Sequence, residues 1–337
     1  MGDQSSTFLD PSGDLLLSTN TQSFVVSSKA LCLASPVWRA MFAPQGHWAK
    51  QSSGVFSLPE DDPDALLIIL RITHLQFSDL PDVLVIYQHL LQLAVLCDKY
   101  DTVKLVRPWI SKWQAPLQAQ AEDSCQTGGD GYLGYETWLF IAWTFGDEAV
   151  FKEISRSLVL TSTVTEVNGE KRLFNAQGNI VGDTMPPGSL EAIIEAHSER
   201  ISALLEMVYK VVDRYESAED TTICRLGQSS KECDSLVYGC LIKGLRSLEL
   251  LPKRLKASQV QLSVKEFADD LRSLKCFMYP GSGKHYNSNH GGYYETISHS
   301  NCAFTLAFEN QIGGIIGQTD PSGVLEVHLT HIKEQKK

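Results

Sequence analysis

The chain lacks the sequence patterns that usually mark an active site. No G-x-S-x-G, H-E-x-x-H or Walker A pattern occurs among its 337 residues. The segment G-S-G-K at 281–284 is similar to part of a phosphate loop, but it has no earlier glycine and no serine or threonine after the lysine. We therefore expect that the protein is not an enzyme.

Signals for membranes and for secretion are also missing. The sequence holds no run of about 18 apolar residues, which a membrane-spanning helix needs. Its first residues lack the basic and apolar regions of a signal peptide, and no Asn-x-Ser/Thr sequon occurs. The eight cysteines do not follow the spacing of a small secreted domain. We expect an intracellular protein, in the cytoplasm or nucleus, with thiols that are free or bound to metal and with no membrane partner.

Basic residues are outnumbered by acidic ones. There are 29 lysines and arginines against 40 aspartates and glutamates, which gives a net charge of −11. Such a chain is poorly suited to a phosphate backbone, so we expect no direct binding to nucleic acid. The short basic cluster P-K-R-L-K at 252–256 is explained by a solvated loop between helices.

The first part of the chain alternates between strand and helix patterns. We expect strands at 14–19 and 24–26, paired across a polar turn, and a third strand at 55–58. Ser28 is predicted to cap one helix, and Ser35 to cap the next, with a proline at its first position.

Three more helices are expected before residue 115. Asp62 is predicted to cap the first of them, and Pro63 to open it. The second runs over about 85–100. The third follows Asp101, and Pro108 should kink or split it.

The second part of the chain is mostly helical in pattern. We expect a buried aromatic helix at 132–145, a helix capped by Asp147, and a β-hairpin at 158–174 that turns at Asn168-Gly169. A long helix should begin at Ser189. It carries a heptad seam formed by Leu190, Ile194, His197, Ile201, Leu204, Val208, Val211 and Tyr215.

That seam has two interpretations, an intermolecular coiled coil or a helix packed in its own domain, and sparse charges beside it favour the second. Further helices are expected at 233–248 and after Ser263, which forms a capping box with Glu266. A strand is predicted around 302–308 in the C-terminal tail.

Three stretches of the first 115 residues resemble the BTB/POZ domain, in the version common in filamentous fungi. They are G-D-L-L-L (13–17) with F-V-V-S-S-K-A-L (24–31) and S-P-V-W-R-A-M-F (35–42), then V-F-S-L-P-E-D-D-P-D-A-L (55–66), then L-A-V-L-C-D-K-Y-D (93–101) with W-I-S-K-W (109–113). The resemblance implies an α+β protein with an N-terminal BTB/POZ domain, built from a three-stranded sheet and helical hairpins. The later segments 154–160, 185–193 and 233–245 resemble the helical C-terminal half of the same fungal proteins.

The resemblance divides the chain into five expected segments. They are a disordered N-terminal tail (1–12), the BTB/POZ domain (13–115), a linker (116–130), a helical C-terminal domain with the hairpin near 158–174 (131–275), and a partly ordered tail rich in Gly, His and Tyr (276–337). Only about a dozen polar residues precede Asp14. The helix and strand that many animal relatives exchange across a dimer are therefore expected to be missing, which makes dimerisation less secure.

The resemblance implies a function in protein–protein interaction, through self-association or recruitment of a partner. Two alternatives stay open. The chain could be a substrate adaptor of a cullin-type ubiquitin ligase, with the cullin bound around residues 60–110, or a scaffold for a nuclear transcription regulator.

The resemblance also points to partner-binding residues. Asp14 and Lys29 match positions that form a charged pocket for co-regulators in transcriptional members. The alternative is that Asp14 only orders the start of a strand and Lys29 is solvated. The second short helix is expected to present an apolar stripe to partners, made of Val37, Trp38, Met41 and Phe42.

Cysteine and histidine spacing predicts a candidate metal site. Cys224 and Cys233 are separated by eight residues, and His299 and Cys302 form an H-x-x-C pair. Three thiolates and one imidazole would complete a tetrahedral structural zinc site with no open position for water. The alternative is that the cysteines are free, because Cys233 also lies on an apolar helix face. Substitute ligands for such a site are Cys276, His285 and His290.

Overall fold

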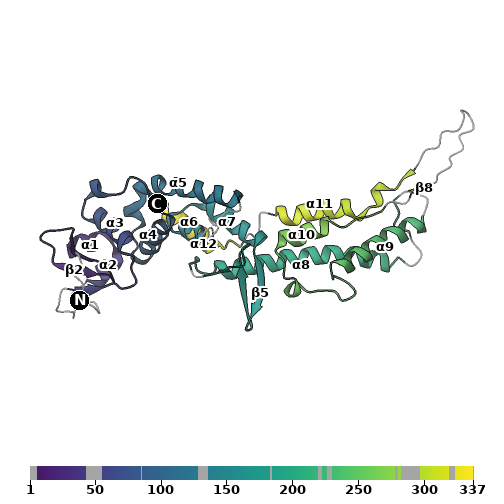
Figure 1. Ribbon diagram of the computed structural model, residues 1–337, viewed down its shortest axis with the longest axis horizontal. Coiled ribbons are helices and arrows are strands. Elements are labelled where there is room, and N and C mark those ends of the chain that lie inside the picture. Colours follow the sequence, from purple (N-terminus) through teal and green to yellow (C-terminus); the bar gives the residue numbers. More distant parts are fainter. Residues whose placement is uncertain are drawn as a thin grey trace, which may run out of the picture. The chain divides into compact units, whose positions relative to one another are not determined.

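The computed structural model describes residues 6–42, 55–84, 86–127, 136–182, 184–218, 222–225, 230–277, 280–281, 297–318 and 323–336 (Figure 1). The fold class is α+β, as expected. The chain divides into two compact units. Unit 1 comprises Met1–Ile154, Asp183–Pro187 and Leu325–Lys337, and unit 2 comprises Ser155–Gly182 and Gly188–Val324.

Unit 1 begins with a four-stranded sheet. Its strands are β1 (Ser6–Phe8), β2 (Leu15–Ser18), β3 (Ser23–Val26) and β4 (Val55–Ser57), in the order β1-β3-β2-β4. The predicted pairing of β2 with β3 is antiparallel, whereas β1 runs parallel to β3 and β4 runs parallel to β2. Strand β1 corrects two expectations. Residues 6–8 of the predicted disordered tail are a strand, and this strand makes the predicted three-stranded sheet four-stranded.

Five helices follow in the same unit. They are α1 (Ser28–Ala34), α2 (Pro36–Met41), α3 (Pro63–Thr73), α4 (Tyr87–Tyr100) and α5 (Val103–Thr127). Ser35 caps α2 by accepting from the backbone N–H of Trp38 at 3.0 Å, and Asp62 caps α3 by accepting from Ala65 at 2.9 Å, both as predicted. The cap of α1 is Ser27 instead of Ser28, because Ser28 is hydrogen-bonded to Asp14.

Helix α5 corrects the predicted linker. It continues through Pro108 and Pro116 to Thr127, so most of the segment 116–130 is helical, and residues 128–130 lie outside the described part. Glutamine and alanine, which dominate 114–121, are good helix formers, which is the physical reason for the continuation. The boundary between the units lies at Ile154, beyond this helix.

The remaining helices of unit 1 come from two distant parts of the chain. Helix α6 (Trp138–Phe145) is almost wholly buried, as predicted, and α7 (Glu148–Thr161) begins beside it. Helix α12 (Glu326–Gln335), which lies in the predicted tail, packs on α6, where the His331 ring stacks on Trp143 with centroids 3.9 Å apart. The last turns of the described chain are therefore part of the N-terminal unit.

Unit 2 opens with a small sheet. Its strands are β5 (Thr163–Val167), β6 (Glu170–Phe174) and β7 (Ile180–Val181), all antiparallel. The hairpin turns at Asn168 and Gly169, both with positive φ, as the sequence predicted. Residues 158–161 belong to the end of α7 and not to the hairpin.

A helical core forms the rest of unit 2. Its helices are α8 (Ser189–Glu216), α9 (Lys231–Ser247), α10 (Val264–Arg272) and α11 (Phe304–Gly317). The heptad seam of α8 is largely buried against the other three helices, in agreement with packing inside its own domain. The predicted capping box of Ser263 and Glu266 is present.

The predicted strand at 302–308 is wrong. Helix α11 occupies that region because Phe304, Phe308 and Ile312 recur every fourth residue, and all three are buried. Short elements lie between the helices: η3 (Ala257–Gln259), β8 (Pro280–Gly281), β9 (Ile297–Ser298) and η4 (Ser300–Cys302).

Candidate metal centre

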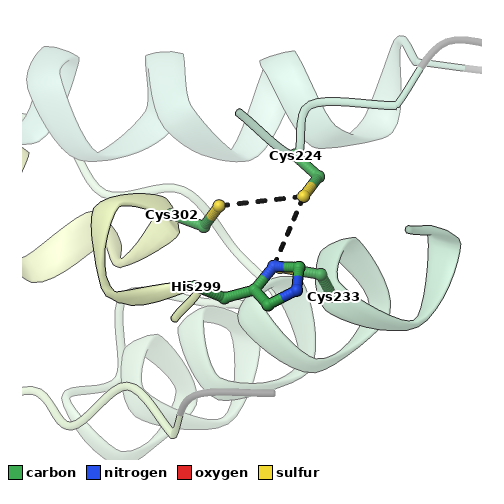
Figure 2. A group of neighbouring side chains, drawn as sticks. All are labelled: Cys224, Cys233, His299 and Cys302. Carbon is green, nitrogen blue, oxygen red and sulfur yellow. Dashed lines mark hydrogen bonds between the residues drawn. The ribbon is translucent and has the colours of Figure 1, made fainter. Parts of the chain in front are cut away.

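The structure brings together the four predicted metal ligands. Cys224, Cys233, His299 and Cys302 each offer one ligand atom, and these atoms all lie within 4.8 Å of one another. In Figure 2 the sulfurs of Cys224 and Cys302 and the imidazole of His299 face a common point. This set of four residues is called the Cys3His cluster below, and it could hold a metal ion.

The first turn of α9 supplies one ligand and anchors a second. Ser230 caps the helix by accepting from the backbone N–H of Cys233 at 3.1 Å, which fixes Cys233 at the positive end of the helix. Next to it, the carboxylate of Asp234 accepts from the backbone N–H of Ile223 at 2.7 Å. This bond holds the segment 222–225 against α9, so Cys224 lies beside Cys233.

The other two ligands share a single tight turn. His299 precedes η4 and Cys302 is its last residue, and the backbone N–H of Cys302 donates to the carbonyl of His299 at 2.9 Å. A spacing of three residues places both side chains on the same side of such a turn. Helix α11 starts directly afterwards, and its buried Phe304 and Phe308 fix the turn to the core of unit 2.

Two distances in the cluster match those between ligands of one tetrahedral ion. The sulfurs of Cys302 and Cys224 are 3.8 Å apart, and the Cys224 sulfur lies 3.4 Å from Nδ1 of His299. With zinc bond lengths of about 2.3 Å to sulfur and about 2.0 Å to nitrogen, tetrahedral geometry separates two sulfurs by about 3.8 Å and a sulfur and a nitrogen by about 3.5 Å. The cluster thus has the size that such an ion requires.

Electrostatics keep the thiols of the cluster protonated as long as no cation is bound. Burial, and then the neighbouring Cys302 and Cys224 thiols, raise the pKa of Cys233 to about 12. Three thiolates cannot lie side by side in this site unless a positive charge compensates them. A divalent ion supplies that charge and is bound by the deprotonated form of each thiol.

The substitute ligands proposed from the sequence do not join the cluster in the described part of the chain. Cys276 lies instead near Cys240, whose sulfur accepts from the backbone N–H of Phe277 at 3.4 Å. His285 and His290 lie outside the described residues.

Asp14 and Lys29 are both exposed, and only Asp14 has a clear local role. The carboxylate of Asp14 accepts from the backbone N–H of Ser28 at 2.8 Å and from its hydroxyl at 2.6 Å. These two bonds, with a smaller contribution from Lys29, lower the pKa of Asp14. The pair ties the start of β2 to the start of α1.

The apolar stripe predicted on the second short helix is mainly a packing surface. Trp38 is 1% exposed, and its ring lies 4.9 Å from that of Tyr100, so it cannot meet a partner in this conformation. Phe42 makes an edge-to-face contact with Phe56. Val37, Met41 and Phe42 are half-buried. Trp38 is therefore corrected from a partner-binding residue to a core residue.

Two features were not predicted from the sequence: the residues that hold the Cys3His cluster in place, and a set of exposed apolar side chains. Ser230 could have been found as a serine three residues before Cys233, the usual position of a helix cap.

The exposed set follows α3 and consists of Leu75, Phe77, Val83 and Ile86. Leu75 has a positive φ and the η1 turn (Phe77–Asp79) follows it, and no periodic pattern reveals these features.

Comparison with known proteins gives no family for the chain. No protein-family model matches it, and no curated protein matches it. Within the described residues, no helix is both long enough and apolar enough to cross a membrane.

Proposed function

We propose that the protein is a non-enzymatic protein-interaction protein whose C-terminal unit is held together by a structural zinc ion in the Cys3His cluster. The observation that carries the zinc assignment is the mutual distance of the four ligand atoms, all within 4.8 Å. Cysteine and histidine are the ligands that zinc prefers, and four of them complete its coordination. A site without an open position for water favours a structural role over a catalytic one.

Zinc would join three segments that the core holds only in part. Cys233 belongs to the buried start of α9, whereas Cys224 and the η4 turn lie on either side of it along the chain. These segments are up to 78 residues apart in sequence, and one ion would bind all three of them together.

Metal analysis of the purified full-length protein tests the zinc assignment. We expect about one zinc ion per chain, and a Cys233→Ser variant should lose most of it. Cys240→Ser is the matched control, because Cys240 lies on the same helix seven residues further on and outside the cluster. Zinc-free wild-type protein, or equal zinc in the two variants, would contradict the proposal.

The interaction function is supported by the way the BTB/POZ-like stretches converge in unit 1. The hydroxyl of Ser35 donates to the carbonyl of Tyr100 at 2.5 Å. Asp61, which is buried, accepts from Lys99 at 2.6 Å and also from the Tyr100 hydroxyl. Residues from all three stretches therefore meet at one point. We propose that this unit has a BTB/POZ fold.

The exposed set Leu75, Phe77, Val83 and Ile86 is the surface that we propose for a partner. Leu75 is 74% exposed and Phe77 is 48% exposed, although their segment is tied down on both sides. Arg71 donates to the carbonyl of Asp79 at 2.7 Å, and Trp113 donates to that of Pro81 at 2.9 Å. Apolar side chains presented by an ordered segment are typical of an interaction site. They lie within 60–110, the region that a cullin would bind.

Binding to a purified cullin of the BTB-binding class tests this surface. We expect the full-length protein to bind, and Leu75→Asp to weaken binding at least tenfold. Leu33→Asp is the control, because Leu33 is 82% exposed on α1, away from this segment of the chain. No binding by the wild type would remove the cullin adaptor and leave self-association, which light scattering on the same protein measures. A strict monomer that binds no cullin would contradict the interaction function proposed for this surface.

A further inference from the structure

The four ligands of the Cys3His cluster differ in their accessibility. Cys233 is fully buried and His299 is 6% exposed, whereas Cys224 and Cys302 are only half-buried. The two accessible thiols are also neighbours, with sulfurs 3.8 Å apart. A small oxidant that reaches the cluster from water therefore meets this pair first.

We propose that the Cys3His cluster is sensitive to oxidation, and that hydrogen peroxide joins Cys224 and Cys302 in a disulfide and releases the metal. This inference rests on the zinc site proposed above. It adds a chemical modification to that site and names the two residues that carry it.

The reaction balances with peroxide as the only oxidant. One thiolate attacks the peroxide, the O–O bond breaks, and a sulfenic acid and hydroxide form. The second thiolate attacks the sulfenic sulfur, which forms the S–S bond and expels a second hydroxide. With two protons taken up, two thiolates and one hydrogen peroxide give one disulfide and two waters. Zinc loses two of its four ligands and departs as the divalent ion.

The geometry requires little movement for this step. An S–S bond is about 2.05 Å long, so the two sulfurs must approach by less than 2 Å from their separation of 3.8 Å. Cys224 belongs to a short segment outside the helices, and Cys302 ends the η4 turn, so neither lies inside a long helix. Cys233, in contrast, lies in the first turn of α9 and is buried.

Oxidation would change which segments are joined. The disulfide keeps the segment 222–225 attached to the η4 turn, but it drops the links to Cys233 and His299. The start of α9 then keeps its core packing, the Ser230 cap and the bond from Ile223 to Asp234, but it loses the metal bond. We expect faster hydrogen exchange in the first turn of α9 after oxidation.

The test uses the full-length, zinc-loaded protein and a titration with hydrogen peroxide. Released zinc is measured with a chromogenic chelator, and disulfides are mapped by mass spectrometry of non-reduced digests. We expect about one zinc ion released per chain, together with a Cys224–Cys302 disulfide, and recovery after dithiothreitol and zinc. Cys240→Ser should behave as the wild type does, because Cys240 is outside the cluster.

The outcomes separate this inference from the zinc site itself. Absence of zinc before peroxide is added would overturn the zinc site and the inference with it. If zinc is present, its retention after oxidation, or its release with a different pair joined, would overturn the redox inference and leave the structural zinc site intact.

Discussion

At the scale of single residues, His197 shows how burial alone sets a chemical property. Its side chain is 2% exposed in the core of unit 2. Burial lowers its pKa to about 4, although a backbone hydrogen bond with Leu262 acts in the opposite direction. The residue is therefore a neutral core histidine, as the heptad pattern indicated.

This pKa predicts a pH dependence of stability. Because the folded-state pKa lies below the unfolded value of about 6.5, the unfolded chain binds more protons between pH 6.5 and pH 4. Stability from this residue is present above pH 6.5 and is lost as pH falls to 4, by about 2–3 kcal/mol. Urea unfolding of wild type and His197→Gln over this range measures the difference. An unchanged pH slope in the variant would contradict the assignment.

The four metal ligands were predicted from residue type and spacing. The contacts that bring them together could not be predicted. H-x-x-C spacing identified His299 and Cys302, and Cys233 was identified by its spacing from Cys224. What brings them together is the bond from Ile223 to Asp234 and the burial of Phe304, which depend on folding of distant segments. Such contacts leave no periodic signal in a single sequence.

At the scale of secondary-structure elements, two glycines of α9 have opposite roles. A Cβ atom on Gly244 would lie 2.8 Å from Cδ2 of Leu274, whereas one on Gly239 would meet nothing within 4 Å. Gly244 thus allows close approach of the segment that follows α10. Gly239 only weakens the helix.

The two glycines give a matched pair of predictions. Gly239→Ala should stabilise unit 2 by about 0.5–1 kcal/mol through helix propensity. Gly244→Ala should be less favourable than Gly239→Ala by about 1–3 kcal/mol, because the side chain of Leu274 must move. Urea unfolding followed by circular dichroism measures both. Equal stabilisation by the two substitutions would show that α9 and Leu274 are not in contact.

Helix α12 shows why the extent of the N-terminal unit was not predictable. Its sequence is short and polar, and only His328 and Ile332 are buried. These two residues are four apart and match one turn of a helix, a pattern too brief to predict an element. Contacts with residues of other helices hold α12 in place. The carbonyl of Gln335 accepts from Arg107, and Trp143 stacks on His331.

Two substitutions on α12 test this packing. Ile332→Ala should cost about 2–4 kcal/mol in unfolding free energy, because the side chain is fully buried against α6. Val327→Ala should change it by less than about 0.5 kcal/mol, since Val327 is 63% exposed. Tryptophan fluorescence during denaturation reports on the α6 surroundings. Similar effects of the two variants would contradict the docking of α12.

At the scale of the whole molecule, the two units are stabilised differently. Unit 1 depends on an apolar core with buried rings of Trp38, Trp113 and Trp138. In unit 2 the proposed zinc ion would contribute to stability as well, because the Cys3His cluster joins segments that are distant in sequence. The α+β class and most helices of the described chain were predictable from periodicity. Strand β1 and helix α12 were not, because contacts with residues far away in the sequence place them in unit 1.

This difference predicts a local effect of metal removal. A chelator should increase hydrogen exchange at residues 222–225, in the first turn of α9 and at 299–302, because these segments lose their shared anchor. Exchange in α3 and α4 of unit 1 should stay unchanged. Mass spectrometry of the exchanged protein measures both regions together, and a uniform increase over the chain would contradict a local role for the metal.

Zinc X-ray absorption spectroscopy on the purified full-length protein tests the zinc site most directly. A structural zinc ion in the Cys3His cluster predicts three sulfurs at about 2.3 Å and one nitrogen at about 2.0 Å around the metal. Cys240→Ser should keep this shell, whereas Cys233→Ser should lose one sulfur or the ion altogether. A shell of oxygen and nitrogen alone, or protein that contains no zinc, would contradict the claim that the Cys3His cluster is a structural zinc site.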